Sequence, residues 1–97
     1  MESTYAGIDR ELVLDGNAVA GLLQEIFSVE MTASPTECAH CGRKGELATL
    51  RAYTRSSGVV LRCSSCGEVV LRIVQTPRAI HLDARGAKCL SLERQLP

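Results

Sequence analysis

The segment "CAHCGRKGELATLRAYTRSSGVVLRCSSCG", residues 38–67, decides the fold. It begins and ends with two cysteines that are separated by two residues, in the pattern Cys38-x2-Cys41-x21-Cys63-x2-Cys66. Two such pairs about 20 residues apart are typical of a zinc site, because each tight turn supplies two thiolates and the intervening chain brings the turns together. We therefore predict that these four cysteines bind one Zn²⁺ ion.

The residues beside the cysteines agree with a metal site. Gly42 and Gly67 each follow the second cysteine of a pair, where a turn around a metal needs a positive φ. Four thiolates and Zn²⁺ carry a net charge of about −2, which the nearby Arg43, Lys44 and Arg62 would offset. A closed set of four sulfurs leaves no position for water or substrate, so the predicted zinc is structural.

Three other uses of paired cysteines are weighed against zinc. Haem attachment requires a histidine directly after the second cysteine, and Gly42 stands there. A thioredoxin-like redox motif would open a helix after a strand, whereas both pairs lie between β-like segments. A rubredoxin-like iron protein that carries electrons uses the same two knuckles and is kept as an alternative. Rubredoxins, however, pack aromatic residues around the metal, and this chain has one Phe, two Tyr and no Trp.

The runs after residue 45 are short and rich in β-forming residues, separated by turn residues. The first two predict a hairpin between the cysteine pairs, and we expect a small α+β fold: a zinc ribbon with an antiparallel β-sheet of about five short strands and one N-terminal helix. The expected strands are "ELATLRAYT" (46–54), "GVVLRC" (58–63), "EVVLRIVQ" (68–75), "RAIHLD" (78–83) and "KCLSL" (88–92).

The last two expected strands are predicted to form a second hairpin. The loop 84–86 has Gly86 where a left-handed conformation is wanted, as in a three-residue hairpin connection. This register pairs Asp83 with Ala87 and His81 with Cys89, and it turns Cys89 outward. It places four apolar residues on the buried face, namely Ile80, Leu82, Leu90 and Leu92.

The segment before the cysteines predicts a helix from about 16 to 28, with Asp15 as its N-cap. Its apolar residues recur at helical spacing, namely Val19, Leu22, Leu23, Ile26 and Phe27. The chain is thus divided into an N-terminal arm with an amphipathic helix (1–34) and a zinc-ribbon domain (35–97). We expect the apolar stripe to dock on the protein's own sheet, with a partner or the twin subunit of a homodimer as alternatives.

Composition limits the class of protein. The chain has 97 residues and five cysteines. We expect neither a membrane span nor a secretory signal, because no apolar run is long enough to cross a bilayer and the first ten residues have neither a basic patch nor an apolar run. We expect a cytoplasmic protein with reduced thiols and no membrane association. Residues 1–37 hold one basic and seven acidic residues, and residues 38–97 hold ten basic and four acidic ones. Such asymmetry suggests that the arm folds onto the body, or that the body meets an anion.

Several segments resemble a known family, among them "LDGNAVAGLLQEIFSVEMTAS", "CAHCG", "GVVLRCSSCGEVVLRIV" and "AIHLDARG". The chain is similar, from Leu14 to Leu92, to short bacterial zinc-ribbon proteins, chiefly actinobacterial, that are catalogued as a domain of unknown function. The likeness is specific in the N-terminal "DGN" and in both cysteine pairs. It implies a zinc ribbon whose metal ligands are Cys38, Cys41, Cys63 and Cys66, and it implies no activity.

We expect a non-enzymatic adaptor or accessory protein that binds a protein partner through its sheet, its N-terminal helix or both. No paired carboxylates, serine–histidine set or phosphate-binding glycine loop suggests an enzyme. The alternative is a nucleic-acid-binding ribbon, because arginines are spread through the sheet region. His40 is expected to point to solvent. His81 and Cys89 are expected to be surface residues, with a second weak metal site or a reactive thiol as alternatives.

Overall fold

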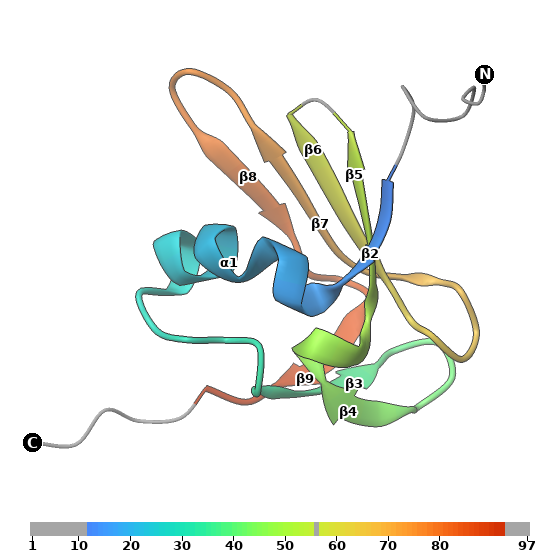
Figure 1. Cartoon of the computed structure of the whole chain (residues 1–97). Coiled ribbons are helices and arrows are strands. Elements are labelled where there is room, and N and C mark those ends of the chain that lie inside the picture. The colour runs from blue at the N-terminus through green and yellow to red at the C-terminus, as the bar shows by residue number, and fades with distance from the viewer. Residues whose placement is uncertain (1–11, 56, 93–97) are drawn as a thin grey trace, which may run out of the picture.

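The computed structural model describes residues 12–55 and 57–92, which form two antiparallel sheets and one α-helix (Figure 1). The larger sheet has the strand order β2-β5-β6-β7-β8, and the smaller one β4-β3-β9. The strands are β2 (Leu12–Asp15), β3 (Pro35–Cys38), β4 (Lys44–Glu46), β5 (Arg51–Arg55), β6 (Gly58–Arg62), β7 (Val69–Gln75), β8 (Ile80–Asp83) and β9 (Ala87–Leu90).

The predicted N-terminal helix is present in two parts. A 3₁₀ turn (Gly16–Val19) leads into α1 (Ala20–Phe27), and Ser28 ends the helix in a left-handed conformation with φ of 62°. The N–H of Asn17 donates to the Asp15 carboxylate at 3.1 Å, so Asp15 caps the first turn as expected. Before this turn lies β2, a strand that the sequence did not predict and that pairs with β5.

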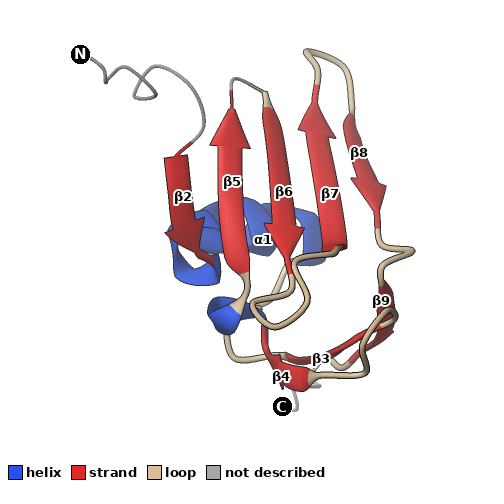
Figure 2. Cartoon of the chain, turned by 90° about the vertical axis from the view of Figure 1, so that its right-hand side faces the viewer, coloured by secondary structure: helices blue, strands red, loops and turns tan. Residues whose placement is uncertain are grey.

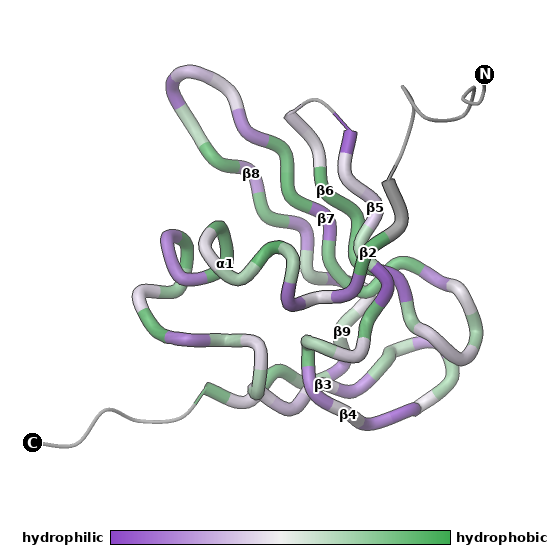
Figure 3. The backbone as a smooth tube through the Cα atoms, viewed as in Figure 1, coloured by the Kyte–Doolittle hydropathy of each residue, from purple (hydrophilic) through white to green (hydrophobic). Residues whose placement is uncertain are grey.

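Helix α1 covers one face of the five-stranded sheet, which is called the inner face below (Figures 1 and 2). Val19 and Leu23 are buried there, and Leu22, Ile26 and Phe27 are half-buried against the same core. The apolar stripe therefore docks on the protein's own sheet, as expected. Apolar stretches on β6 and β7 supply the other side of this core (Figure 3). The largest fully buried side chains are Leu23, Met31, Leu47, Leu61, Leu71 and Ile73.

The expectation of about five strands in a single sheet is wrong, because the expected strand 46–54 is interrupted. A 3₁₀ turn (Leu47–Thr49) separates β4 from β5 and directs them into different sheets. The N–H groups of Leu47 and Ala48 donate to the carbonyls of Ser34 and Thr32, so this turn is fixed against the segment after the helix. The described residues thus form sheets of five and three strands.

The predicted hairpin of the last two strands is also wrong. Strand β8 pairs with β7, where His81 lies opposite Val74, whereas β9 pairs with β3, where Cys89 lies opposite Glu37. His81 and Cys89 are therefore in different sheets. Three of the four apolar residues that this hairpin was expected to bury remain accessible, with exposures of 37% for Ile80, 39% for Leu82 and 48% for Leu92. The fourth, Leu90, is half-buried against the core.

Gly86 explains why the chain leaves the larger sheet at this point. Its φ is not among the positive values, so the predicted left-handed hairpin position is incorrect. A Cβ atom at Gly86 would lie 1.9 Å from the carbonyl oxygen of Val69, and the Gly86 carbonyl accepts a hydrogen bond from Ala39 at 2.9 Å. A glycine is therefore required here for close backbone contact, and the hydrogen bond to Ala39 holds the chain beside the first cysteine turn, next to β3.

Among the described residues, no helix is long and apolar enough to cross a membrane.

Candidate metal centre

The first cysteine turn lies between β3 and β4 and is closed by two backbone hydrogen bonds. The N–H of Gly42 donates to the Cys38 carbonyl at 2.9 Å, and the N–H of Cys38 donates to the Arg43 carbonyl at 2.9 Å. Gly42 has φ of 81°, as predicted for a turn around a metal.

The second cysteine turn lies between β6 and β7 and repeats this geometry. The N–H of Gly67 donates to the Cys63 carbonyl, and the N–H of Cys63 donates to the Glu68 carbonyl, both at 2.9 Å. Gly67 has φ of 80°. The two turns are thus matching knuckles, and the predicted hairpin β5–β6 leads from one toward the other.

The sulfurs of the two knuckles meet in one cluster. All four lie within 4.8 Å of one another, and Sγ of Cys38 is 3.7 Å from Sγ of Cys66, as is Sγ of Cys41 from Sγ of Cys63. A tetrahedron with Zn–S distances of about 2.3 Å has sulfur–sulfur edges of about 3.8 Å. The cluster therefore has the dimensions of a tetrahedral thiolate site and could hold a metal ion.

The first cysteine of each knuckle is buried, and its surroundings favour the ionised thiolate form. The backbone N–H of Cys41 lowers the pKa of Cys38 below its ordinary value. Burial raises the pKa of Cys63, but the N–H groups of Cys66 and Ser65 and the neighbouring thiols outweigh it and lower the pKa to about 7. The N–H of Ser65 lies 3.4 Å from Sγ of Cys63, so a backbone donor points at this sulfur.

The fourth sulfur, that of Cys66, is disfavoured as a thiolate. The N–H of Glu68 favours the thiolate of Cys66, but loss of hydration and the three neighbouring sulfurs together raise the pKa of Cys66 to about 12. Repulsion between adjacent thiolates therefore opposes full ionisation of the set. A divalent cation at the centre would offset this repulsion, because it would attract all four thiolates at once.

The basic residues near the knuckles have different roles. Arg62 donates from Nη1 to the Gly67 carbonyl at 2.9 Å, so it braces the second knuckle. Arg43 donates to the hydroxyl of Thr49 at 3.3 Å, outside the cluster. Lys44 lies in β4 opposite Glu37. His40, within the first knuckle, is exposed and is not one of the clustered ligands.

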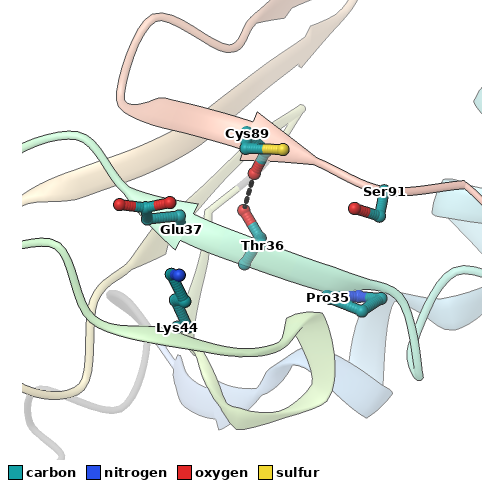
Figure 4. A pocket seen from close by; sticks show the side chains of 6 residues that line it. All are labelled: Pro35, Thr36, Glu37, Lys44, Cys89 and Ser91. Atoms are coloured by element: carbon teal, nitrogen blue, oxygen red, sulfur yellow. Dashed lines mark hydrogen bonds between the residues drawn. The ribbon is translucent and has the colours of Figure 1, made fainter.

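Cys89 lies apart from this cluster, on the smaller sheet. It is exposed, and its carbonyl accepts a hydrogen bond from the Thr36 hydroxyl at 3.0 Å (Figure 4). It borders a shallow pocket of about 200 Å³, lined by Pro35, Thr36, Glu37, Lys44, Cys89 and Ser91. The expected outward orientation of Cys89 is correct, although the pairing with His81 that led to it is not.

Sequence reasoning missed an alignment of arginines. The face of the larger sheet opposite α1, called the outer face, has no described helix or strand over it (Figure 2). The register places Arg51 opposite Arg62 and, further along, Val60 opposite Arg72, while the alternate residues Ala52, Leu61 and Leu71 are buried beneath the helix. The alternation Arg51-x-Tyr53-x-Arg55 was visible in the sequence, but only the strand register shows that these arginines share a face.

Comparison with protein families adds one finding to this geometry. The model of a family of unknown function, DUF6510, matches residues 8–95. The chain belongs to DUF6510. This agrees with the resemblance to a domain of unknown function, while the zinc-ribbon character and bacterial distribution of the relatives stay predictions. No curated protein and no solved structure matches the chain.

Proposed function

We propose that this member of DUF6510 is a non-enzymatic, zinc-stabilised adaptor of the cytoplasm that presents the outer face of its five-stranded sheet to a protein partner. The zinc part of this proposal rests on the sulfur cluster, in which two sulfur–sulfur distances of 3.7 Å between the knuckles suit one tetrahedral Zn²⁺. Cys38, Cys41, Cys63 and Cys66 would be its ligands. With four protein ligands the metal has no position for water or substrate, so its role is structural rather than catalytic.

The binding role rests on which surfaces remain free. The apolar stripe of α1 is used within the core, because Leu23 is fully buried and Ile26 and Phe27 pack against the same cluster. The helix therefore offers a partner only its polar side. The outer face of the sheet carries arginines, Tyr53 and half-buried valines, and no described element covers it. We assign partner binding to this face.

Nucleic acid is the second candidate partner, and the shared face of the arginines favours it, since cations contact phosphates. The aromatic side chain on this face argues against nucleic-acid binding. The guanidinium of Arg62 lies 5.6 Å from the centre of the Tyr53 ring, so the tyrosine on this face is already covered by a cation. Proteins that bind single strands without sequence preference rely on free aromatic side chains for bases to stack on. An electron carrier with iron stays a third candidate, which the colour of the purified protein tests.

Site-specific photo-crosslinking in the native cell tests the adaptor role. A photoreactive residue at Val74, on the outer face, should capture a discrete protein that survives nuclease treatment. The same residue at Gln24, on the exposed side of α1, is the matched control and should capture much less of it. Loss of the adduct on nuclease treatment would favour nucleic acid instead, and crosslinking of the chain to itself would indicate a homodimer.

A further inference from the structure

Five arginines share the outer face of the larger sheet and are called the arginine face below. They come from β5, β6, β7 and the loop after β8, and they are Arg51, Arg55, Arg62, Arg72 and Arg85. Within residues 12–55 and 57–92, the ion pair on this face joins Arg85 to Asp83 at 3.0 Å, on side chains that are 89% and 37% exposed. Asp15 lies opposite Arg51 and Asp83 lies opposite Arg72, so the five arginines outnumber the two aspartates that stand across from them.

Two of these arginines stand directly opposite each other. Arg51 on β5 pairs in register with Arg62 on β6. Like charges directly across neighbouring strands are destabilising. A carboxylate placed between them would convert this repulsion into two charge-assisted hydrogen bonds, since guanidinium groups bind carboxylates with matched geometry.

The arginine face is also hollowed and has an apolar floor. Three adjoining hollows of about 470, 390 and 220 Å³ lie along it, and Arg62, Arg72, Tyr53 and Val60 each line two of them. Val60 and Val74 are half-buried between the arginines. The surface therefore combines cationic walls with room for apolar side chains.

Acidic residues limit the width of this surface. Asp15 on β2 lies opposite Arg51, and Asp83 on β8 lies opposite Arg72. Apart from Arg85, which pairs with Asp83, the positive strip is thus confined to β5, β6 and β7, which span about 10 Å at the usual strand spacing. That width suits one extended chain better than a broad polyanion such as a duplex.

From these features we infer that the arginine face binds an extended acidic segment of the partner protein, in which glutamates or aspartates are interspersed with aliphatic residues. The carboxylates would meet the arginines, and the aliphatic side chains would fill the hollows over Val60 and Val74. This inference rests on the adaptor role proposed above and specifies the chemistry of the partner. Single-stranded nucleic acid would leave the aliphatic floor unused and would lack a free aromatic ring to stack on.

The test uses the whole zinc-loaded chain and a short fluorescent peptide of the repeated sequence Glu-Val-Asp-Leu. Fluorescence anisotropy at physiological salt should show binding of this peptide and none of a peptide with lysine at the acidic positions. Arg72 lines two of the hollows and is exposed, so Arg72→Glu should weaken peptide binding by about 10-fold or more, as loss of a charged hydrogen bond implies. Arg78→Glu is the matched control, because it makes the same charge change in the β7–β8 turn, away from the face, and should change affinity by less than about 2-fold.

Several results would overturn the inference. Equal weakening of peptide binding by Arg72→Glu and Arg78→Glu would mean that the peptide is attracted only by the overall charge of the protein. Tighter binding of oligothymidine than of the acidic peptide would assign the face to nucleic acid. If Arg72→Glu fails to fold, peptide-induced NMR shifts in the unmodified chain decide: they should appear at Val60 and Val74 and spare Leu23. Absence of peptide binding, with a protein still crosslinked at Val74, would reject the acidic segment and leave the adaptor role standing.

Discussion

Gly16 lies against the backbone of Leu47 so closely that a Cβ atom at Gly16 would stand 2.0 Å from the Leu47 carbonyl oxygen. This contact joins the 3₁₀ turn before α1 to the 3₁₀ turn between β4 and β5. It also explains the "DGN" motif: Asp15 accepts from the N–H of Asn17, and the glycine between them permits the backbones to touch.

Gly16→Ala should therefore destabilise the fold. The obstacle is backbone rather than a flexible side chain, so one of the two turns must move, and overpacking of this kind costs typically about 1–3 kcal/mol. Gly21→Ala is the matched control, because a Cβ there meets nothing within 4 Å and alanine favours the helix by up to about 1 kcal/mol. Urea unfolding of the metal-loaded chain should show opposite shifts for the two variants. Equal midpoints would mean that the Gly16 contact is absent in solution.

Removing the buried part of the helix stripe should have a larger effect. Leu23 has no exposed surface, so Leu23→Asp loses the apolar contact and buries a carboxylate without a partner, which together should exceed about 3 kcal/mol. The neighbouring Gln24 is exposed, and Gln24→Asp should stay within about 0.5 kcal/mol. Thermal unfolding followed by circular dichroism measures both. An unchanged melting temperature for Leu23→Asp would show that the helix does not dock on the sheet in solution.

The cysteine knuckles could be predicted from the sequence because their geometry is local. Spacing of the cysteines and a glycine with positive φ define each turn, and Gly42 and Gly67 have φ of 81° and 80°. The helix was also predictable, since its apolar period is independent of the rest of the chain. Local chemistry and periodicity are therefore sufficient to identify all four clustered cysteines and the helix that covers the sheet.

The division into two sheets could not be predicted, because it depends on contacts between distant residues. A glycine such as Gly86 is typical of a hairpin loop, but here it packs against Val69 and accepts a hydrogen bond from Ala39 of the first knuckle, and β9 then pairs with β3. Strand β2 is only four residues long and adjoins the helix, so its sequence is too short to show the alternation of apolar and polar residues that identifies a strand. The arginine face likewise needed the register of β5, β6 and β7, because alternation alone does not say which side the helix covers.

Metal content gives a direct prediction about the centre. The purified chain should contain one Zn²⁺ per molecule. A chelator should abolish cooperative unfolding, because structural zinc contributes on the order of 10 kcal/mol in small domains. Cys63→Ser removes a buried ligand of the cluster and should lose both metal and stability. Cys89→Ser makes the same change at a cysteine that is not one of the clustered ligands and should retain both. Iron as the native metal, or native chemical shifts after complete metal removal, would contradict the structural zinc.

Alkylation should distinguish Cys89 from the four clustered cysteines. Cys41 and Cys66 are exposed like Cys89, so burial does not shield them, and coordination to a metal is the protection expected of both. Brief treatment of the zinc-loaded chain with iodoacetamide should therefore modify Cys89 alone, whereas after chelation, which also removes the cooperative fold, the other four cysteines should react as well. Peptide mass spectrometry identifies the modified sites. Rapid modification of Cys41 or Cys66 with zinc present would show that the cluster does not hold the metal, and protection of Cys89 would mean that a second chain or a partner covers β9.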